Sequence, residues 1–202
     1  MTLPSHCDLR RGIRSWQALG NLTNNDCTVA AYMHLTMVHN LAAASSWQRL
    51  LYRVGFRPPH NAYATAEYVD FLRIHGMPRS SGVDPAQFLA WEQSKGRVLD
   101  YQTIDISGPD PNAAIRQAMV DWDGCLLALE MTEEAYQIGT SRGAWILKAG
   151  QVVEPTLAHA VALVAYTPTM NAFVTWGIMK EMDVAFTNAA VYECLVFRTS
   201  AP

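Results

Sequence analysis

The chain lacks the features that mark several large classes of protein. It has no excess of positive charge, because 15 lysines and arginines stand against 18 aspartates and glutamates, for a formal net charge of −3. A basic surface is the usual electrostatic sign of nucleic-acid or anionic-lipid binding. No hydrophobic run approaches the ~20 apolar residues of a membrane span, and residues 1–11 lack the apolar core of a signal peptide. We therefore expect no nucleic-acid partner and no membrane partner.

Cysteine is also scarce and widely spaced. The four cysteines are Cys7, Cys27, Cys125 and Cys194, and no two of them form a C-x-x-C pair. Zinc sites and disulfide frameworks depend on cysteines at characteristic spacings. We therefore expect no metal and no cofactor, and we favour a reducing, cytoplasmic location.

What the chain does have is apolar material, since half of its 202 residues are hydrophobic. That length is enough to bury one substantial core. No internal repeat, low-complexity tract or linker interrupts the sequence. The prediction is a single domain over residues 1–202.

The first two-thirds of the chain is predicted to be rich in helices. Apolar periodicity and helix stop signals predict helices over 28–43, 46–54, 64–75, 85–94 and 111–120. Asn24, Asn25 or Asp26 can cap the first of these helices. Asp84 and Pro85 form a cap followed by a proline at the first helical position of the fourth.

The last third of the chain changes its period. Short apolar runs predict strands over 125–131, 145–147, 159–166, 172–176 and 192–197. Helices first and strands afterwards favour an α+β fold over an alternating parallel sheet. This order predicts an N-terminal helical lobe, a C-terminal antiparallel sheet lobe, and a cleft between the helix that bears Cys27 and the strand that bears His159.

Two residues could supply nucleophilic chemistry. Cys27 opens the first predicted helix, where the dipole and the free N–H groups of the first turn favour a thiolate; its alternative role is that of a small buried hydrophobe. His159 opens a remote strand and could act as general base, or simply end the strand. His34 shares the helix face of Cys27 but lies ~10 Å away along the axis, too far to pair with the thiol. Asp26 could cap the helix or raise the pKa of the thiol.

Asn21 stands six residues before Cys27. Its side-chain N–H could stabilise a developing oxyanion together with the backbone N–H of Cys27. An asparagine that follows a glycine is otherwise an ordinary turn residue. Only its distance in sequence from Cys27 favours the catalytic interpretation.

Four motifs occur together in this chain. They are Gly-Asn-Leu-Thr-Asn-Asn-Asp-Cys-Thr-Val-Ala-Ala at 20–31, His-Ala-Val-Ala-Leu-Val-Ala-Tyr at 159–166, Val-Thr-Trp-Gly at 174–177 and Glu-Cys-Leu-Val-Phe at 193–197. The set resembles small papain-like cysteine-peptidase-fold proteins of bacteria and their phages. It is also similar to the His-Ala-Val and Ser-Trp-Gly elements of papain and, in its Asp-Cys pair, to the leader peptidases of bacteriocin exporters. The resemblance covers about 9–40 and 124–198 and leaves 41–123 unmatched.

The resemblance implies a papain-like α+β fold and covalent acyl chemistry. Cys27 would attack, His159 would shuttle protons and Asn21 would stabilise the oxyanion. The substrate would be a peptide, another amide or an acyl thioester, including one bound to a carrier protein. The acyl-enzyme would pass to water in a hydrolase, as peptidase or amidase, or to an amine in an amide-forming acyltransferase.

The chain departs from papain at the residue that orients the histidine. Val174 occupies the position of the papain asparagine, and a valine cannot hydrogen-bond to imidazole. Thr175 beside it and Asn171 three residues earlier are the polar candidates for this role. Trp176 is expected to pack beneath the histidine. The departure keeps open the alternative that the chain is a binding or structural protein that has lost its activity.

Overall fold

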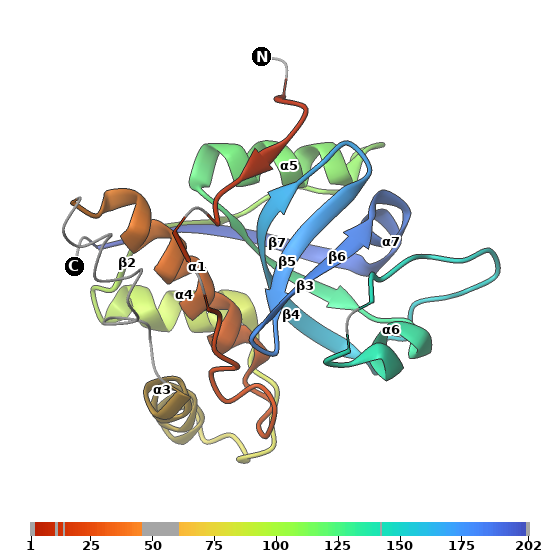
Figure 1. The fold of residues 1–202 in the computed structure, drawn as a ribbon. Helices are drawn as coiled ribbons and strands as arrows, with labels where there is room; N and C mark the ends of the chain where they lie inside the picture. Colours follow the sequence, from red (N-terminus) through yellow and green to blue (C-terminus); the bar gives the residue numbers. More distant parts are fainter. Residues whose placement is uncertain (1–2, 11, 14, 46–60, 142, 201–202) are drawn as a thin grey trace.

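The computed structural model describes residues 3–10, 12–13, 15–45, 61–141 and 143–200. The helices are α1 (Cys27–Ala43), α3 (Asn61–Ile74), α4 (Pro85–Ser94), α5 (Pro111–Trp122), α6 (Glu133–Ile138) and α7 (Val184–Ala190). The strands are β1 (Cys7–Asp8), β2 (Val98–Thr103), β3 (Cys125–Glu130), β4 (Ala158–Tyr166), β5 (Met170–Thr175), β6 (Ile178–Asp183) and β7 (Val191–Thr199). Figure 1 shows how these elements are arranged.

A single sheet organises the molecule. Its strands run in the order β2-β7-β3-β4-β5-β6, β1 pairs with β4 off this path, and every pairing between these strands is antiparallel. Helices lie on both sides of the sheet (Figure 1). The predicted α+β class, with helices first and an antiparallel sheet afterwards, is confirmed. One refinement is that β1 and β2, from the first half of the chain, also join the sheet.

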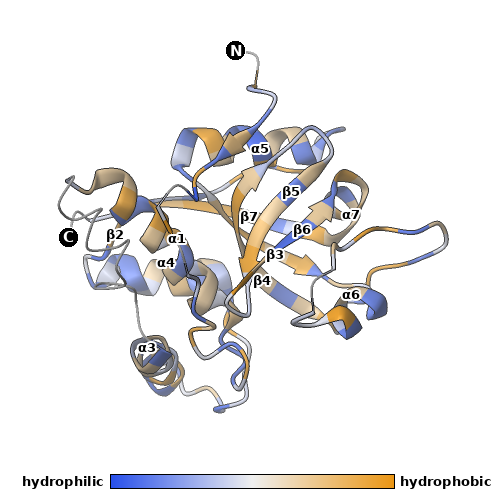
Figure 2. Cartoon of the chain, in the orientation of Figure 1, coloured by the Kyte–Doolittle hydropathy of each residue, from blue (hydrophilic) through white to orange (hydrophobic). Residues whose placement is uncertain are grey.

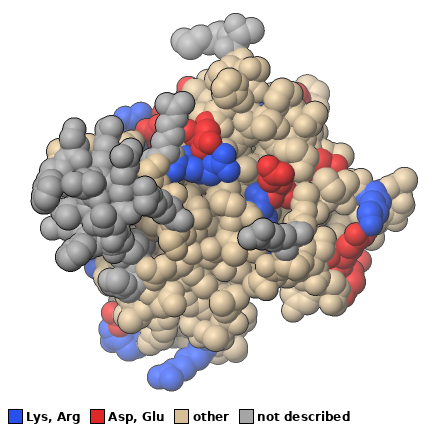
Figure 3. All heavy atoms as spheres, in the orientation of Figure 1, with Lys and Arg blue, Asp and Glu red and all other residues tan. Residues whose placement is uncertain are grey.

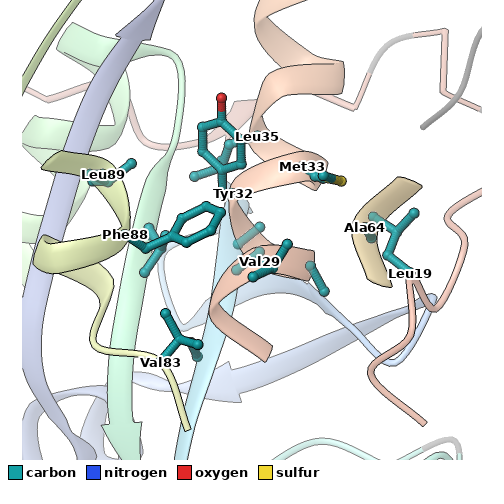
Figure 4. Packing of buried hydrophobic residues seen from close by; sticks show 14 of the residues in the cluster. Leu19, Val29, Tyr32, Met33, Leu35, Ala64, Val83, Phe88 and Leu89 are labelled. Carbon is teal, nitrogen blue, oxygen red and sulfur yellow. The ribbon is translucent and has the colours of Figure 1, made fainter. Parts of the chain in front are cut away.

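Each face of the sheet buries its own apolar cluster, as the alternation of side chains along a strand requires. On β4, Ala160 and Ala162 face the cluster of α1, α3 and α4, whereas Val161 and Leu163 face the cluster of α5 and α7. The central strands accordingly carry mostly hydrophobic colours in Figure 2. Figure 4 shows part of the first cluster, in which Tyr32 of α1 lies beside Phe88 of α4 and Leu19 lies beside Ala64 of α3.

Local signals predicted several elements well. The predicted helix 85–94 is α4 itself, and the Asp84 carboxylate caps it by accepting a hydrogen bond of 2.8 Å from the Gln87 N–H. The helix α3 begins three residues before the predicted 64–75. The predicted helix 46–54 lies outside the described residues.

Other elements were missed or wrong. The predicted strand 145–147 is only a single bridge, between Trp145 and Met182. The strand β6 was missed because its sequence, Ile-Met-Lys-Glu-Met-Asp, is charged. Its Lys180 is nevertheless buried, since its ammonium group donates to the carbonyls of Ser141 and Gly143. β2, α6 and α7 were also not predicted.

The charge pattern of the surface is mixed. On the face drawn in Figure 3, charged atoms are few and both signs occur. Among the helices of the described residues, none combines the length and the apolar character that crossing a membrane requires.

Candidate active site

Cys27 is the first residue of α1, and α1 packs against β4. Burial raises the pKa of the Cys27 thiol. The backbone N–H groups of Ala160, Thr28 and Cys27 itself face the sulfur and oppose this rise, because they favour the thiolate. Ala160 directly follows His159 in β4, so the contact with Ala160 links the thiol to the strand that carries the histidine.

His159 lies at the start of β4, paired with Leu129 of β3, and is only 8% exposed. Its Nε2 lies 2.6 Å from the Thr175 hydroxyl oxygen of the neighbouring β5. Its ring stacks on Trp176, with centroids 4.8 Å apart and planes 26° from parallel, as expected from the sequence. Burial lowers the pKa of His159 to about 4. The imidazole is therefore neutral at physiological pH.

The contact with Thr175 determines which nitrogen can act as a base. If Nε2 carries the proton and donates it to the Thr175 oxygen, Nδ1 is left with a free lone pair. No hydrogen bond between Nδ1 and another described residue is formed in the structure. A neutral imidazole held in this tautomer can accept a proton from a thiol.

Asn171 lies in a different polar cluster. Its side chain accepts from Arg116 at 2.9 Å and donates to Asn112 at 2.7 Å and to Thr187 at 2.8 Å. These partners come from α5 and α7, and they surround Asn171 four residues from Thr175 along the same face of β5. Of the two candidates for orienting His159, the structure brings Thr175 to the imidazole and leaves Asn171 away from it.

Asn21 is buried in a turn that leads into α1. Its backbone N–H donates to the Ala18 carbonyl at 3.0 Å, and the Gly20 carbonyl accepts from the N–H groups of Thr23 and Asn24 at 2.9 and 3.1 Å. No hydrogen bond joins the Asn21 side-chain amide to another described residue. Among the residues that the structure describes, its N–H group is therefore not engaged.

Three contacts anchor the segment before this turn. Gln17 accepts through its carbonyl from the His34 Nε2 at 2.8 Å, and the Leu19 N–H donates to the Asn61 side chain at 2.7 Å. A Cβ built on Gly177 would lie 2.6 Å from the Ala18 nitrogen, so the turn after Trp176 presses directly on this segment. The turn after Trp176, whose ring stacks on His159, therefore contacts the segment that leads to Asn21.

Sequence reasoning missed these anchors. His34 was excluded as a partner of the thiol, and it is bonded to Gln17 instead. The positive φ of Trp176 (49°) and Gly177 (75°) ends β5 one residue before the tryptophan that the strand prediction included. The Trp-Gly pair was the only signal of this turn, and it did not reveal what the turn would contact.

Asp26 occupies the N-cap position of α1, but its carboxyl makes no capping hydrogen bond. Asn25 instead binds the Ser80 carbonyl at 2.6 Å through its side-chain amide. Capping by a side chain is therefore not what starts this helix. Within the described part of the chain, no group of three or more His, Cys, Asp or Glu side chains could hold a metal ion.

Comparison with solved structures identifies the fold. The chain is similar to xylellain, a cysteine protease from Xylella fastidiosa, with a TM-score of 0.68 and 11% identity over 98% of this chain and 87% of that one. It is also similar to digestive procathepsin L 3 of Tenebrio molitor larval midgut (TM-score 0.67, 11% identity, 98% and 71% covered). The cysteine protease CMS1MS2 of Carica candamarcensis, solved with E-64, gives a TM-score of 0.53 at 13% identity, with 97% and 99% covered.

Comparisons at the level of sequence give no such match. No protein-family model matches the chain, and no curated protein matches it significantly. At 11–13% identity the structural neighbours show the fold alone. The chain therefore has the α+β fold of papain-like cysteine proteases, and its activity has to be argued from its own residues.

Proposed function

We propose that this protein is a cysteine-nucleophile enzyme that acts on a peptide, another amide or an acyl thioester through a covalent acyl-enzyme. The observation that carries the proposal is the arrangement at the start of α1. The Cys27 sulfur faces the N–H of Ala160, and the preceding His159 has its Nε2 held by Thr175. The papain-like fold supports the assignment.

The proposed reaction moves one proton twice. His159 Nδ1 takes the proton from the Cys27 thiol as the sulfur attacks the carbonyl carbon of the substrate. The oxyanion that forms is stabilised by N–H groups of the Asn21 side chain and of the Cys27 backbone. The imidazolium then gives its proton to the leaving amine or thiol as the bond to that group breaks, which leaves the acyl group on Cys27.

Burial makes the resting pair neutral rather than ionic. It raises the pKa of the Cys27 thiol and lowers that of His159 to about 4, so both shifts disfavour a thiolate–imidazolium pair before substrate binds. Proton transfer would therefore accompany attack instead of preceding it.

Water or an amine can resolve the acyl-enzyme. The first makes the protein a peptidase or amidase, and the second makes it an amide-forming acyltransferase, for which the donor can be an acyl thioester on a carrier protein. Purified protein incubated with peptide, amide and thioester donors, with and without amines, distinguishes the two outcomes by product. Turnover that persists in Cys27→Ala would contradict the mechanism.

Two observations favour a second candidate, a binding or structural protein that retains the fold without activity. Val174 replaces the expected asparagine, and the buried thiol has a raised rather than a lowered pKa. Reactive cysteines are usually found with lowered pKa values. Covalent labelling of Cys27 separates the two candidates, because a retired site would leave the thiol unactivated.

A further inference from the structure

Asp26 is a buried acid directly before the proposed nucleophile, and it has no hydrogen-bond partner among the described residues. Its exposed fraction is 0%, and neither carboxyl oxygen has a hydrogen-bond partner in the described structure. The Asn24 side chain and the N–H of Asp26 itself face the carboxyl but do not reach hydrogen-bond geometry. A buried carboxylate without such partners is strongly disfavoured, so the group avoids ionising.

The carboxyl packs against the turn that carries Asn21. A Cβ on Gly20 would lie 2.1 Å from the Asp26 Oδ2, and Gly20 has a φ of +91°. A glycine is therefore required here for two reasons: the backbone has a positive φ, and the Asp26 carboxyl leaves no space for a Cβ. The carbonyl of the same glycine receives two of the turn's backbone hydrogen bonds. Asp26 thus packs on the residue around which the turn is built.

The described surroundings of Asp26 supply no compensating cation. From α3, the Thr65 hydroxyl lies near the same point of Gly20, and Tyr68 is the titratable group that interacts with the acid. From α1, the titratable neighbour is Cys27. None of the described lysines or arginines lowers the pKa of the Asp26 carboxyl. Burial raises that pKa to about 7.

We propose that Asp26 is a positioning residue that acts in its neutral form, holding the Gly20–Asn24 turn against the start of α1 and lowering the reactivity of Cys27 when it loses its proton. The neutral acid fills the space above Gly20 without placing charge beside the thiol. The ionised acid adds a negative charge next to Cys27, which disfavours a second one on the sulfur. The inference rests on the proposed function, because the turn matters to catalysis through Asn21.

The rate at which iodoacetamide alkylates Cys27 tests this role between pH 5.5 and 8.5. Asp26→Asn keeps the shape of the side chain but cannot ionise. We expect equal rates in wild type and Asp26→Asn at pH 5.5, and a rate about three- to tenfold higher in Asp26→Asn at pH 8.5. Asp100→Asn, which removes an exposed acid from β2, is the control and should follow wild type. A ratio of rates that does not change with pH would indicate a merely structural residue and overturn the proposal.

Urea unfolding supplies a readout that needs no reaction at Cys27. The folded-state pKa of about 7 lies above the ordinary 3.8, so the native protein holds this proton more tightly than the unfolded chain. The stability that Asp26 adds is therefore complete below pH 3.8 and is lost as pH rises through about 7. We expect the stability of wild type relative to Asp26→Asn to fall between pH 5 and pH 8, and a constant difference would contradict a neutral Asp26.

The two proposals can fail separately. Turnover that persists in Cys27→Ala would overturn the proposed function, while the unfolding comparison would still report on Asp26. If the difference in stability between wild type and Asp26→Asn does not change with pH, while Cys27→Ala abolishes turnover, only the role of Asp26 is overturned.

Discussion

Two buried histidines show how similar burial produces different chemistry. His34 lies within α1 and His159 at the start of β4, and their exposed fractions are 0% and 8%. Burial lowers the pKa of each to about 4. Both rings are therefore neutral near pH 7, and each uses Nε2 for one hydrogen bond.

The difference lies in the partners of the two rings. His34 donates to the backbone carbonyl of Gln17, and its Nδ1 is sealed from solvent with no hydrogen-bond partner among the described residues. His159 binds the Thr175 hydroxyl, and neither of its nitrogens is sealed in this way. A sealed nitrogen cannot exchange a proton with a substrate, so His34 is suited to anchoring the segment before Asn21 and His159 to acting as a base.

The largest expected effect is the loss of stability when the two histidines are forced to ionise. Their folded-state pKa values of about 4 lie below the ordinary 6.5, so the unfolded chain binds these protons more tightly. The free energy of unfolding should therefore fall by about 3 kcal/mol per histidine as pH falls from 6.5 to 4. Urea unfolding of His34→Leu and of His159→Leu, each compared with wild type at both pH values, measures how much of the pH-dependent loss of stability each histidine causes.

A pH-independent difference for either variant would contradict the burial of that ring in neutral form. The comparison with wild type is needed because Asp26 acts in the opposite direction over an overlapping range. Its raised pKa makes stability fall, not rise, as pH increases toward 7.

A smaller effect is expected where the histidine side of the site touches the segment that His34 anchors. Gly177→Ala would place its Cβ 2.6 Å from the Ala18 nitrogen, whereas Gly150, with a similar φ (+82° against +75°), has open space around it. Both variants strain the backbone at a positive φ, but only the Cβ of Gly177→Ala also clashes with the backbone of Ala18. Gly177→Ala should be about 2 kcal/mol less stable than Gly150→Ala in urea unfolding.

The labelling rate of Cys27 sharpens this comparison. Gly177→Ala should slow alkylation of Cys27, because the turn before α1 has to move, and Gly150→Ala should leave the rate unchanged. Equal stability and equal labelling in the two variants would show that this contact does not position the site.

The smallest effect is expected at Thr175, because its hydroxyl binds His159 whereas His34 binds a backbone carbonyl. Thr175→Val keeps the shape of the buried side chain but removes the acceptor of the Nε2 proton, so the imidazole loses its fixed tautomer. We expect the reaction rate at Cys27 to fall about tenfold, a part of the ~10²–10⁴ that general acid–base catalysis contributes. Thr175→Ser retains the hydroxyl and should keep most of the rate. Equal losses in both variants would assign the effect to packing instead.

The sequence predicted those features that depend on a few neighbouring residues. The α4 cap needs only Asp84, Pro85 and the Gln87 N–H, all within one turn of helix. The change of apolar period after residue 124 likewise predicted most of the sheet. In contrast, the charged β6 is a strand because its Lys180 finds carbonyl partners in a loop about 40 residues away, which no local pattern reports.

The candidate site shows the same limit. Sequence spacing left Thr175 and Asn171 open as partners of His159, because the choice depends on strand register, which decides which position along β5 lies beside the imidazole. It also offered Asp26 as a helix cap. Asp26 instead packs against Gly20, because the turn of 18–24 lies against the start of α1. Such contacts follow from tertiary packing and not from the residues on either side.

The most direct test of the account is the alkylation of the four cysteines by iodoacetamide near neutral pH, followed by mass spectrometry of each site. Cys125 and Cys194 are fully buried, so partly exposed Cys7 is the informative reference. If Cys27 and His159 act together, His159 should take the thiol proton as the sulfur attacks, so Cys27 should react faster than Cys7, and His159→Ala should slow Cys27 without affecting Cys7. Equal rates at Cys27 and Cys7, unchanged by His159→Ala, would contradict the proposed chemistry and identify a retired site.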